Sequence, residues 1–461
     1  TRRSSDLNAG SDTEYAGVKQ LMPGKVLIAN QRGIKFKQVD FKEKFNLAEM
    51  DKKEMIARFR EIMFSSIRKK LILGSISLAF SGGIDTKIIL ATANKYRLPI
   101  ETFTVEFESQ AEYKKKDYQL AKETSAKFKV KHYRLRLSPR KFLKNIESFI
   151  ESSNRLINFN NLNSVCILEL ISRQGNIIVT GDGTEEQLSL YQHHVFPFSA
   201  DLLLESVPLE NARKLRKSIL ETYCNLFFSR SWEWRDASSD ENEKVFKRNL
   251  FTNSVLEKVE KHKASKIFYD CFSVSPDTIF SPYKNSPMPS FFNKALWVDF
   301  SNNFKPKIFA VYDIISRLKS VEIQSPFLDA DFADFSSKIP GMFKFKLGTR
   351  LGKYIMRQSA EKLIGKKNAY TTFKSGSDIP FDEWLLDPYF EKYVRSILNK
   401  KRIKKYGILN HKYVERVISE HYKERELFKE PRFGRLNKKG RDHTHKILKL
   451  LGFQLWMENN F

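Results

Sequence analysis

Apolar positions recur in this chain with two different periods. From Asp51 to Lys70 they follow the 3.6-residue spacing of an amphipathic helix, whereas the stretches that follow are short apolar runs typical of buried strands. Strands that alternate with helices predict an α/β fold, a parallel sheet with flanking helices and right-handed crossovers. The predicted strands are Ile100 to Phe107, His132 to Leu135 and Asn176 to Thr180, and the predicted helices are Tyr113 to Phe128, one from Pro139, and Leu162 to Arg173.

The rest of the chain is organised around Ser77 to Tyr96, which reads SLAFSGGIDTKIILATANKY. The pattern predicts a strand, a tight glycine turn at Ser81-Gly82-Gly83 and a helix that begins near Asp85-Thr86. Backbone amides at such a helix start favour a pyrophosphate, and the two hydroxyls can donate to phosphate oxygens. An aspartate beside phosphates indicates a bound Mg²⁺. An ordinary turn with an acidic first helical residue is the alternative.

A second acidic loop follows the strand that ends at Thr180, reading TGDGTEE. Crowded carboxylates repel one another unless cations or hydrogen-bond donors lie near. Because the ends of parallel strands meet at one edge of a sheet, we expect this loop to share a Mg²⁺-pyrophosphate site with Ser81 and Asp85. An exposed acidic turn is the alternative. No Walker lysine pattern and no GxGxxG follows the first strand, which disfavours kinase-like and dinucleotide-binding sites.

Composition restricts the classes of possible binding partner only in part. The 461 residues carry a formal net charge of +27, which suits a polyanionic partner but equally describes a solvated lysine-rich surface; nucleic acid is disfavoured without being excluded. Three widely spaced cysteines predict neither a zinc site nor a disulfide framework and favour a cytoplasmic protein. We expect no membrane span and no secretion signal, because no apolar run is long enough.

Five stretches in order resemble the synthetase domain of the asparagine synthetase family, whose relatives include β-lactam synthetases and lasso peptide cyclases. SGGIDT is similar to the SGGxD pyrophosphate loop of ATP pyrophosphatases, and TGDGTEE stands where the family has SGEGxDE. SVEIQSPFLD, GTRLGKYIMRQ and the FKSG and PFDEWL segments resemble further family motifs, and the tail DHTHKILKLLGFQLW resembles its closing helix. The resemblance implies an adenine nucleotide α-hydrolase-like fold with a helical elaboration.

The resemblance also implies roles for single residues. Ser81, Gly82, Gly83 and Thr86 would hold the β and γ phosphates of ATP, and Asp85 with Glu185 would hold Mg²⁺. Lys374 would stabilise charge on the α-phosphate, with Lys353 as a second cation, and Asp182 would accept the proton of an incoming amine. Backbone near the following three residues would line the adenine: Ala79, Val105 and Gly181.

The same resemblance divides the chain into residues 1–50, a polar tail and a short β remnant similar to the end of a glutaminase domain, and residues 51–461, the synthetase domain. Tyr15 to Gln38 predicts one or two hairpins. Because most of a glutaminase domain is not in this chain, we expect ammonia, a separate glutaminase chain or an amine of the substrate to supply nitrogen. A processed or truncated precursor is a further alternative, and a homodimer is compatible.

Departures from the family gather on the substrate side, where Asn163 and Ile314 replace arginines. We therefore predict an AMP-forming carbon–nitrogen ligase of the asparagine synthetase type, which adenylates a carboxylate and transfers ammonia or an amine to it. The departures support adenylation better than they support aspartate as the acceptor, and leave open a carboxylate of a peptide, a sugar acid or a secondary metabolite. A peptide or metabolite cyclase of the same fold is one alternative; a tRNA-directed or non-catalytic ATP-binding relative is another. We interpret residues 192–305 as a helical subdomain and residues 396–441 as a flexible lid or linker. His193-His194 and the pair His443 and His445 predict no metal site.

Overall fold

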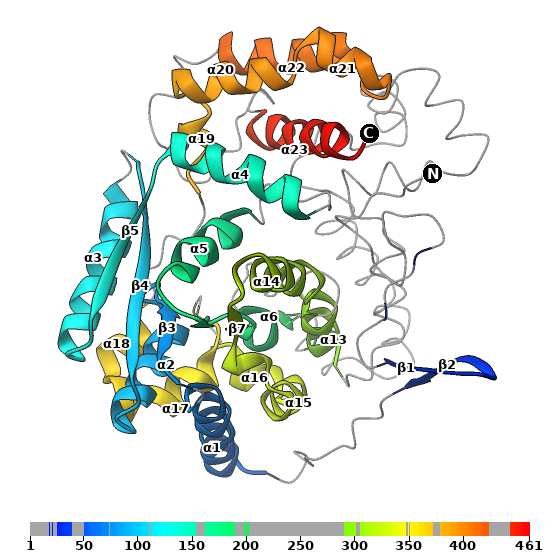
Figure 1. Ribbon diagram of the computed structural model, residues 1–461. Helices are drawn as coiled ribbons and strands as arrows, with labels where there is room; N and C mark the ends of the chain where they lie inside the picture. Colours follow the sequence, from blue (N-terminus) through cyan, green and yellow to red (C-terminus); the bar gives the residue numbers. More distant parts are fainter. Residues whose placement is uncertain are drawn as a thin grey trace.

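The structure is a computed structural model that describes residues 18, 21, 25–38, 50–72, 74–109, 112–153, 162–189, 198–199, 201, 290–300, 305–346, 349, 351–371, 379–423 and 443–461. Its strands are β1 (Lys25–Asn30), β2 (Gly33–Gln38), β3 (Ile76–Ala79), β4 (Ile100–Phe107), β5 (His132–Leu137), β6 (Ile177–Val179) and β7 (Glu322–Gln324). Figure 1 shows the five strands from β3 to β7 with helices packed around them.

The helices up to the acidic loop are α1 (Lys52–Leu71), α2 (Ile84–Lys95), α3 (Glu112–Lys127), α4 (Pro139–Ser153), α5 (Leu162–Ser172) and α6 (Thr184–Leu188). The middle of the chain adds α13 (Phe291–Val298), α14 (Lys305–Lys319), η6 (Pro326–Leu328), α15 (Ala330–Lys338) and α16 (Gly341–Lys344). The last part adds α17 (Tyr354–Ile364), α18 (Lys366–Tyr370), α19 (Phe381–Trp384), α20 (Pro388–Ile397), α21 (Lys400–Tyr406), α22 (His411–Lys423) and α23 (Thr444–Asn460).

The large sheet is parallel throughout, with strand order β5-β4-β3-β6-β7. The predicted α/β fold with a parallel sheet is therefore confirmed. The bounds predicted for the strands and helices around the sheet agree with the structure to within about one residue, except that β5 runs two residues further, to Leu137. From β3 the chain proceeds outward to β4 and β5, and then returns to add β6 on the other side of β3. The loops after β3 and β6 thus diverge at a switch point, which is where open parallel sheets bind ligands.

Two hydrophobic cores pack on opposite faces of this sheet, because neighbouring residues of a strand point to opposite sides. In β6, Ile178 belongs to one core and Val179 to the other. The core that contains Val179, here called the α2 core, is built from α1, α2, α15 and α17. The core that contains Ile178, here called the α14 core, is built from α4, α5, α14 and the helices after α18.

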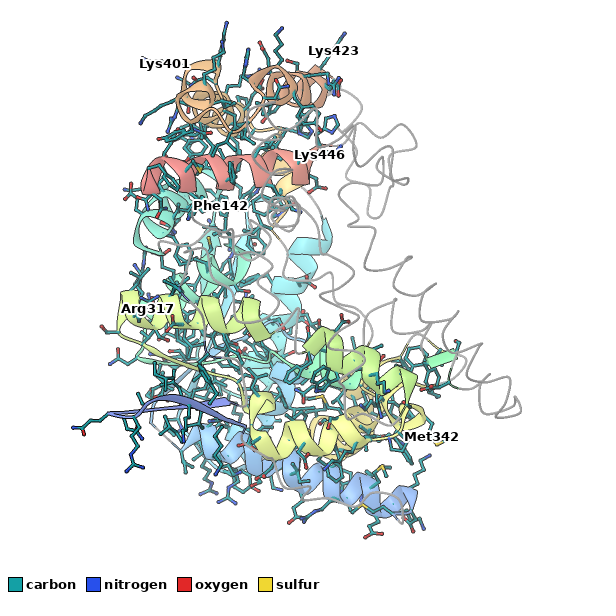
Figure 2. All side chains as sticks on the ribbon, turned by 90° about the vertical axis from the view of Figure 1, so that its right-hand side faces the viewer. Phe142, Arg317, Met342, Lys401, Lys423 and Lys446 are labelled. Carbon is teal, nitrogen blue, oxygen red and sulfur yellow. The ribbon has the colours of Figure 1, made fainter. Side chains whose placement is uncertain are left out.

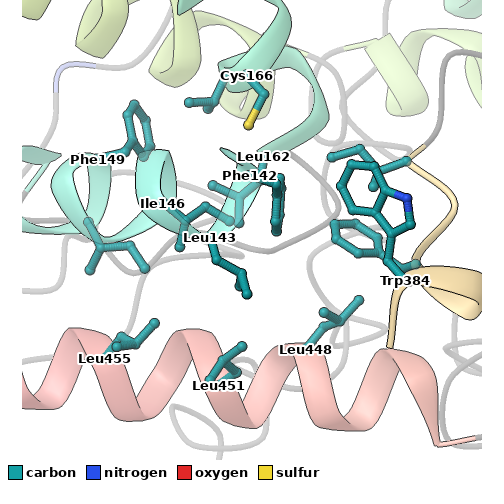
Figure 3. Close-up of a cluster of buried hydrophobic side chains, with 14 of the residues drawn as sticks. Phe142, Leu143, Ile146, Phe149, Leu162, Cys166, Trp384, Leu448, Leu451 and Leu455 are labelled. Atoms are coloured by element: carbon teal, nitrogen blue, oxygen red, sulfur yellow. The ribbon is translucent and has the colours of Figure 1, made fainter. Parts of the chain in front are cut away.

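The close-up in Figure 3 shows how the α14 core joins distant parts of the chain. Phe142 and Leu143 of α4 face Leu448 and Leu451 of the C-terminal helix α23, with Trp384 beside them. All five side chains are almost fully buried. Because burial of one such side chain contributes about 1.5–3 kcal/mol, α23 is held firmly although it comes last in the chain.

The expectation of a flexible lid or linker at residues 396–441 is wrong for residues 396–423, which complete α20 and form α21 and α22. Residues 424–442 lie outside the described ranges. Ile403, Val414 and Val417 are buried against the α14 core, while the lysines between them face outward. Figure 2 shows Lys401 and Lys423 at the outer edge of this helical layer. The charged run is thus the solvated face of amphipathic helices.

The predicted hairpin is present as the antiparallel pair β1 and β2, which forms a sheet of its own. Leu27 pairs with Phe36 and Ala29 pairs with Ile34, so these four side chains share one face. Phe36 and Ile34 are 64% and 65% exposed. The assignment of residues 1–50 to a glutaminase remnant stays a prediction. Among the residues that the structure describes, every helix is too short or too polar to cross a membrane.

Candidate functional site

The loop between β3 and α2 forms a tight turn closed by hydroxyl groups. Gly82 has φ +67°, and an added Cβ would lie 3.2 Å from the backbone nitrogen of Ala121, so a side chain does not fit there. Ser81 Oγ accepts from the amide of Gly83 at 3.3 Å and lies 3.5 Å from Thr86 Oγ1. The N-cap residue of α2 is Gly83, which has no side chain that could form a capping hydrogen bond. The loop therefore presents two adjacent hydroxyls at a helix N-terminus, which suits phosphate oxygens.

Asp85 is buried in the first turn of α2 and has partners from two distant segments. The Lys353 ammonium lies 2.9 and 2.8 Å from its two carboxylate oxygens, and Thr184 Oγ1 donates to Oδ1 at 2.7 Å. The same ammonium lies 3.4 Å from Glu185 Oε1 in α6. The two carboxylates predicted to hold Mg²⁺ therefore converge on one lysine in this structure.

Lys353 itself is fixed at the backbone. It occupies the left-handed region, with φ 56° and ψ 33°, at the N-cap position of α17. Its amide donates to the carbonyls of Leu188 at 2.9 Å and Ser189 at 3.0 Å, at the end of α6. The helix thus begins at Tyr354, one residue after the lysine, and its start is tied to the acidic loop that carries Glu185.

Gly181 allows the two loops to approach each other. A Cβ at this position would lie 3.0 Å from Thr86 Cγ2 and 3.1 Å from Asp85 Cβ, closer than most real Cβ contacts. The segment after β6 therefore packs directly on the first turn of α2. Ala79 and Val105, predicted to line the adenine, are half-buried residues of the adjacent strands β3 and β4. The structure brings the two predicted loops to the same edge of the sheet.

Asp182 lies in the same acidic loop but faces a different partner. Tyr312 of α14 donates to Asp182 Oδ2 at 2.5 Å, and its hydroxyl lies 2.5 Å from Thr180 Oγ1. Ser325 Oγ donates to the backbone carbonyl of Asp182 at 2.7 Å. Burial raises the pKa of Tyr312 well above its usual value, and the charge of Asp182 adds to the shift, so the hydroxyl keeps its proton at neutral pH.

The site predicted from the sequence lacked two of these residues. Tyr312 lies two residues before Ile314, the position where the family carries an arginine. Asp313, between them, is exposed and pairs with Arg317 at 3.2 Å, so it lies outside the site. An aromatic residue with a hydroxyl at a buried position of a helix was the available signal, because buried tyrosines need a hydrogen-bond partner. Thr184 could be anticipated only from its place in the acidic loop.

Several predicted positions lie outside the described residues. Among them is Lys374, the proposed main catalytic lysine, together with the whole segment 372–378. His193, His194 and most of residues 192–305 are also outside. Within the described ranges, no group of three or more His, Cys, Asp or Glu side chains could hold a metal ion. Two carboxylates are still sufficient for a Mg²⁺ that binds mainly through phosphates.

Two known proteins are similar to this chain. The chain is similar to asparagine synthetase 1, described as glutamine-hydrolyzing, from Bacillus subtilis, with 23% identity over 451 residues. The match covers 96% of this chain and 66% of the relative, so the chain spans slightly less than two thirds of that protein's length. A solved NMN synthetase from Francisella tularensis is similar over 31% of this chain and 60% of its own, with 18% identity and a TM-score of 0.22.

The chain also matches a known protein family over most of its length. Residues 71–458 match the asparagine synthase family, a range that begins before β3 and ends within α23. It includes both loops of the site, Lys353 and Tyr312. Because this range covers most of the chain, the protein belongs to the asparagine synthase family.

Proposed function

We propose that this chain is an AMP-forming carbon–nitrogen ligase that adenylates a carboxylate with ATP and then transfers nitrogen to it. The observation that carries the proposal is the convergence of Asp85, Glu185 and Lys353 beside the hydroxyls of Ser81 and Thr86. Hydroxyls, helix amides, carboxylates and an ammonium at one sheet edge match the needs of a pyrophosphate with its metal ion.

In the proposed site, Ser81, Gly82, Gly83 and Thr86 bind the β and γ phosphates. Mg²⁺ would be held by Asp85 and Glu185, and when bound it would neutralise charge on the phosphates. Its fit rests on the donor set, two carboxylates from adjacent loops that present hard oxygen ligands. Adenine would lie along Ala79, Val105 and Gly181.

In the first proposed step, a carboxylate oxygen of the acceptor attacks the α-phosphorus, and the bond to the β-phosphate oxygen breaks to release pyrophosphate. Lys374 and Lys353 would stabilise the negative charge that grows on the transferred and leaving groups. The product is an acyl-adenylate. Positive groups held in place beforehand act strongly here because a half-buried site screens charge less than bulk water does.

In the second proposed step, nitrogen attacks the carbonyl carbon and AMP leaves. The nitrogen must lose a proton, and Asp182 would accept it. Tyr312 supports this role because its hydroxyl donates to Asp182 Oδ2 and so fixes the orientation of the carboxylate. Tyr312 thus acts as a positioning residue in the proposed step.

The acceptor and the nitrogen source are proposed only as classes. Ile314 and Asn163, which replace arginines of the aspartate-using relatives, favour a carboxylate other than aspartate, such as one on a peptide, a sugar acid or a secondary metabolite. The similar Bacillus subtilis protein is described as glutamine-hydrolyzing, which supports ammonia from a glutaminase as one source. A substrate amine is the other source and would make the product cyclic or condensed.

The decisive experiment is exchange of labelled pyrophosphate into ATP. We expect exchange only when a carboxylate acceptor is present, so a panel of carboxylates identifies the substrate class. Lys374→Ala should abolish the exchange. Exchange without any acceptor, or exchange that survives loss of Lys374, would show that these roles are wrong. Retardation of tRNA in a gel at physiological salt, with no carboxylate-dependent exchange, would support the tRNA-directed alternative instead.

A further inference from the structure

The Lys353 ammonium occupies the place between the two carboxylates that a divalent ion would use. It lies within 2.9 Å of both oxygens of Asp85 and 3.4 Å from Glu185 Oε1. The lysine side chain is 2% exposed and that of Asp85 is 9% exposed. Buried carboxylates without a counter-ion are costly, so this contact maintains the loop before any ligand arrives.

A divalent cation and this ammonium exclude each other. Both need the same Asp85 oxygens, and two cations placed a few ångströms apart in a half-buried site repel strongly. The lysine backbone is pinned by its amide bonds to Leu188 and Ser189, so only the flexible four-carbon stem can move. For the metal to enter, the ammonium must move to another anion, and the neighbouring Glu185, 3.4 Å away, is itself a proposed ligand of the metal.

The phosphates of a nucleotide would provide that anion. The hydroxyls of Ser81 and Thr86 mark the phosphate side of Asp85, at the start of α2. We propose that Lys353 is the counter-ion of Asp85 and Glu185 in the ligand-free site. Metal then binds only after or together with the nucleotide, whose phosphates accept the displaced ammonium. The inference rests on the proposed nucleotide function but concerns the order of binding rather than the reaction.

The test uses Mn²⁺ as the probe, followed by electron paramagnetic resonance of the free ion and by titration calorimetry. Wild-type chain should bind Mn²⁺ weakly alone and at least ~10-fold more tightly with a non-hydrolysable ATP analogue. Lys353→Met should bind Mn²⁺ without nucleotide at least ~10-fold more tightly than the wild type does. Adding Asp85→Asn to Lys353→Met should remove this binding. Lys344→Met, which removes another buried lysine away from the site, should behave as the wild type.

The proposal is overturned if wild-type chain binds Mn²⁺ alone as tightly as Lys353→Met does, at a site that Asp85→Asn removes. If Lys353→Met is unfolded in chelator, Mn²⁺ should restore its near-ultraviolet circular dichroism while K⁺ at equal ionic strength should not. Failure of Mn²⁺ to restore the fold counts against the proposal. A wild-type chain that binds no ATP analogue in any condition would overturn the proposed function instead, whereas the nucleotide-free arms test Lys353 alone.

Discussion

Asp85, in the first turn of the helix after β3, and Asp182, in the loop after β6, both follow a central parallel strand but contact different kinds of partner. Asp85 faces an ammonium and a hydroxyl from Lys353 and Thr184, which come from the side of the α2 core. Asp182 faces the hydroxyl of Tyr312, which belongs to the α14 core. The contacts of Asp85 include a full positive charge, which suits ion exchange, whereas those described for Asp182 include a hydroxyl that orients the carboxylate.

The difference assigns the two proposed half-reactions to two sides of one sheet edge. In the proposed mechanism, adenylation depends on the charge balance around Asp85, and amide formation depends on Asp182 as the proton acceptor. Substitutions should therefore separate the two measurements, exchange of pyrophosphate into ATP and release of amide product. If both aspartates only hold the loops together, each substitution should reduce pyrophosphate exchange and amide release to a similar extent.

Asp85→Asn should have the largest effect. It removes the charge that balances Lys353 and a proposed metal ligand, so pyrophosphate exchange should fall by about 10³-fold or more. The measurement is exchange with a saturating carboxylate. Asp313→Asn, which removes an exposed carboxylate paired with Arg317, is the matched control and should change exchange less than about two-fold. Near-normal exchange in Asp85→Asn would remove this residue from the mechanism.

Asp182→Asn should affect mainly the second half-reaction. Asparagine can keep a hydrogen bond with Tyr312 but cannot accept the proton of an amine, so amide formation should fall by roughly 10²–10³-fold. Exchange should stay within about three-fold of the wild type, since the adenylation groups are untouched. Parallel loss of both activities, with the fold intact, would argue that Asp182 is structural.

Tyr312→Phe should have a smaller effect, of about ten-fold on amide formation. The Tyr312 hydroxyl donates to Asp182 Oδ2, so its loss should leave the proposed proton acceptor less well oriented. Amide formation should therefore slow, while pyrophosphate exchange should stay within about three-fold of the wild type. Equal losses of both activities would mean that Tyr312 contributes packing alone.

Lys344→Met tests a buried ammonium that lacks a described carboxylate partner. Lys344 donates to Asn293 at 2.9 Å, and burial lowers its pKa from 10.5 to about 7. Between these values the unfolded chain binds more protons, so stability rises with pH, and the penalty is complete below about pH 7. The methionine variant should gain roughly 4 kcal/mol more at pH 6 than at pH 10 in denaturant unfolding. An equal change at both pH values would contradict this.

Local patterns in the sequence sufficed for much of the fold and part of the site. The strand, glycine turn and helix around Asp85 follow from neighbouring residues, and the parallel sheet follows from alternating strands and helices. The pairing of Lys353 with Asp85 joins residues 268 positions apart, and that of Tyr312 with Asp182 spans 130. Packing of distant segments decides such contacts, and no spacing rule encodes them.

The wrong expectation for residues 396–423 has a similar cause. The run KKRIKK in α21 looks like a solvated linker when charge is weighed alone. Its single isoleucine, Ile403, and the valines of α22 supply the buried stripe that turns the segment into helices on the α14 core. The many lysines and arginines concealed a helical spacing of the few apolar residues, which is enough to form a buried stripe.

The sharing of β6 between two cores has a consequence for how activity would be lost during unfolding. Val179 anchors the strand to the α2 core, which includes residues of α17, the helix that begins after Lys353. Ile178 anchors it to the α14 core, which includes Tyr312. If the cores open as separate cooperative units, the weaker one decides which half-reaction fails first as denaturant rises. Heat-sensitive variants would then fall into two classes. One class would lose formation of the proposed acyl-adenylate, and the other would form the acyl-adenylate but fail to convert it to amide.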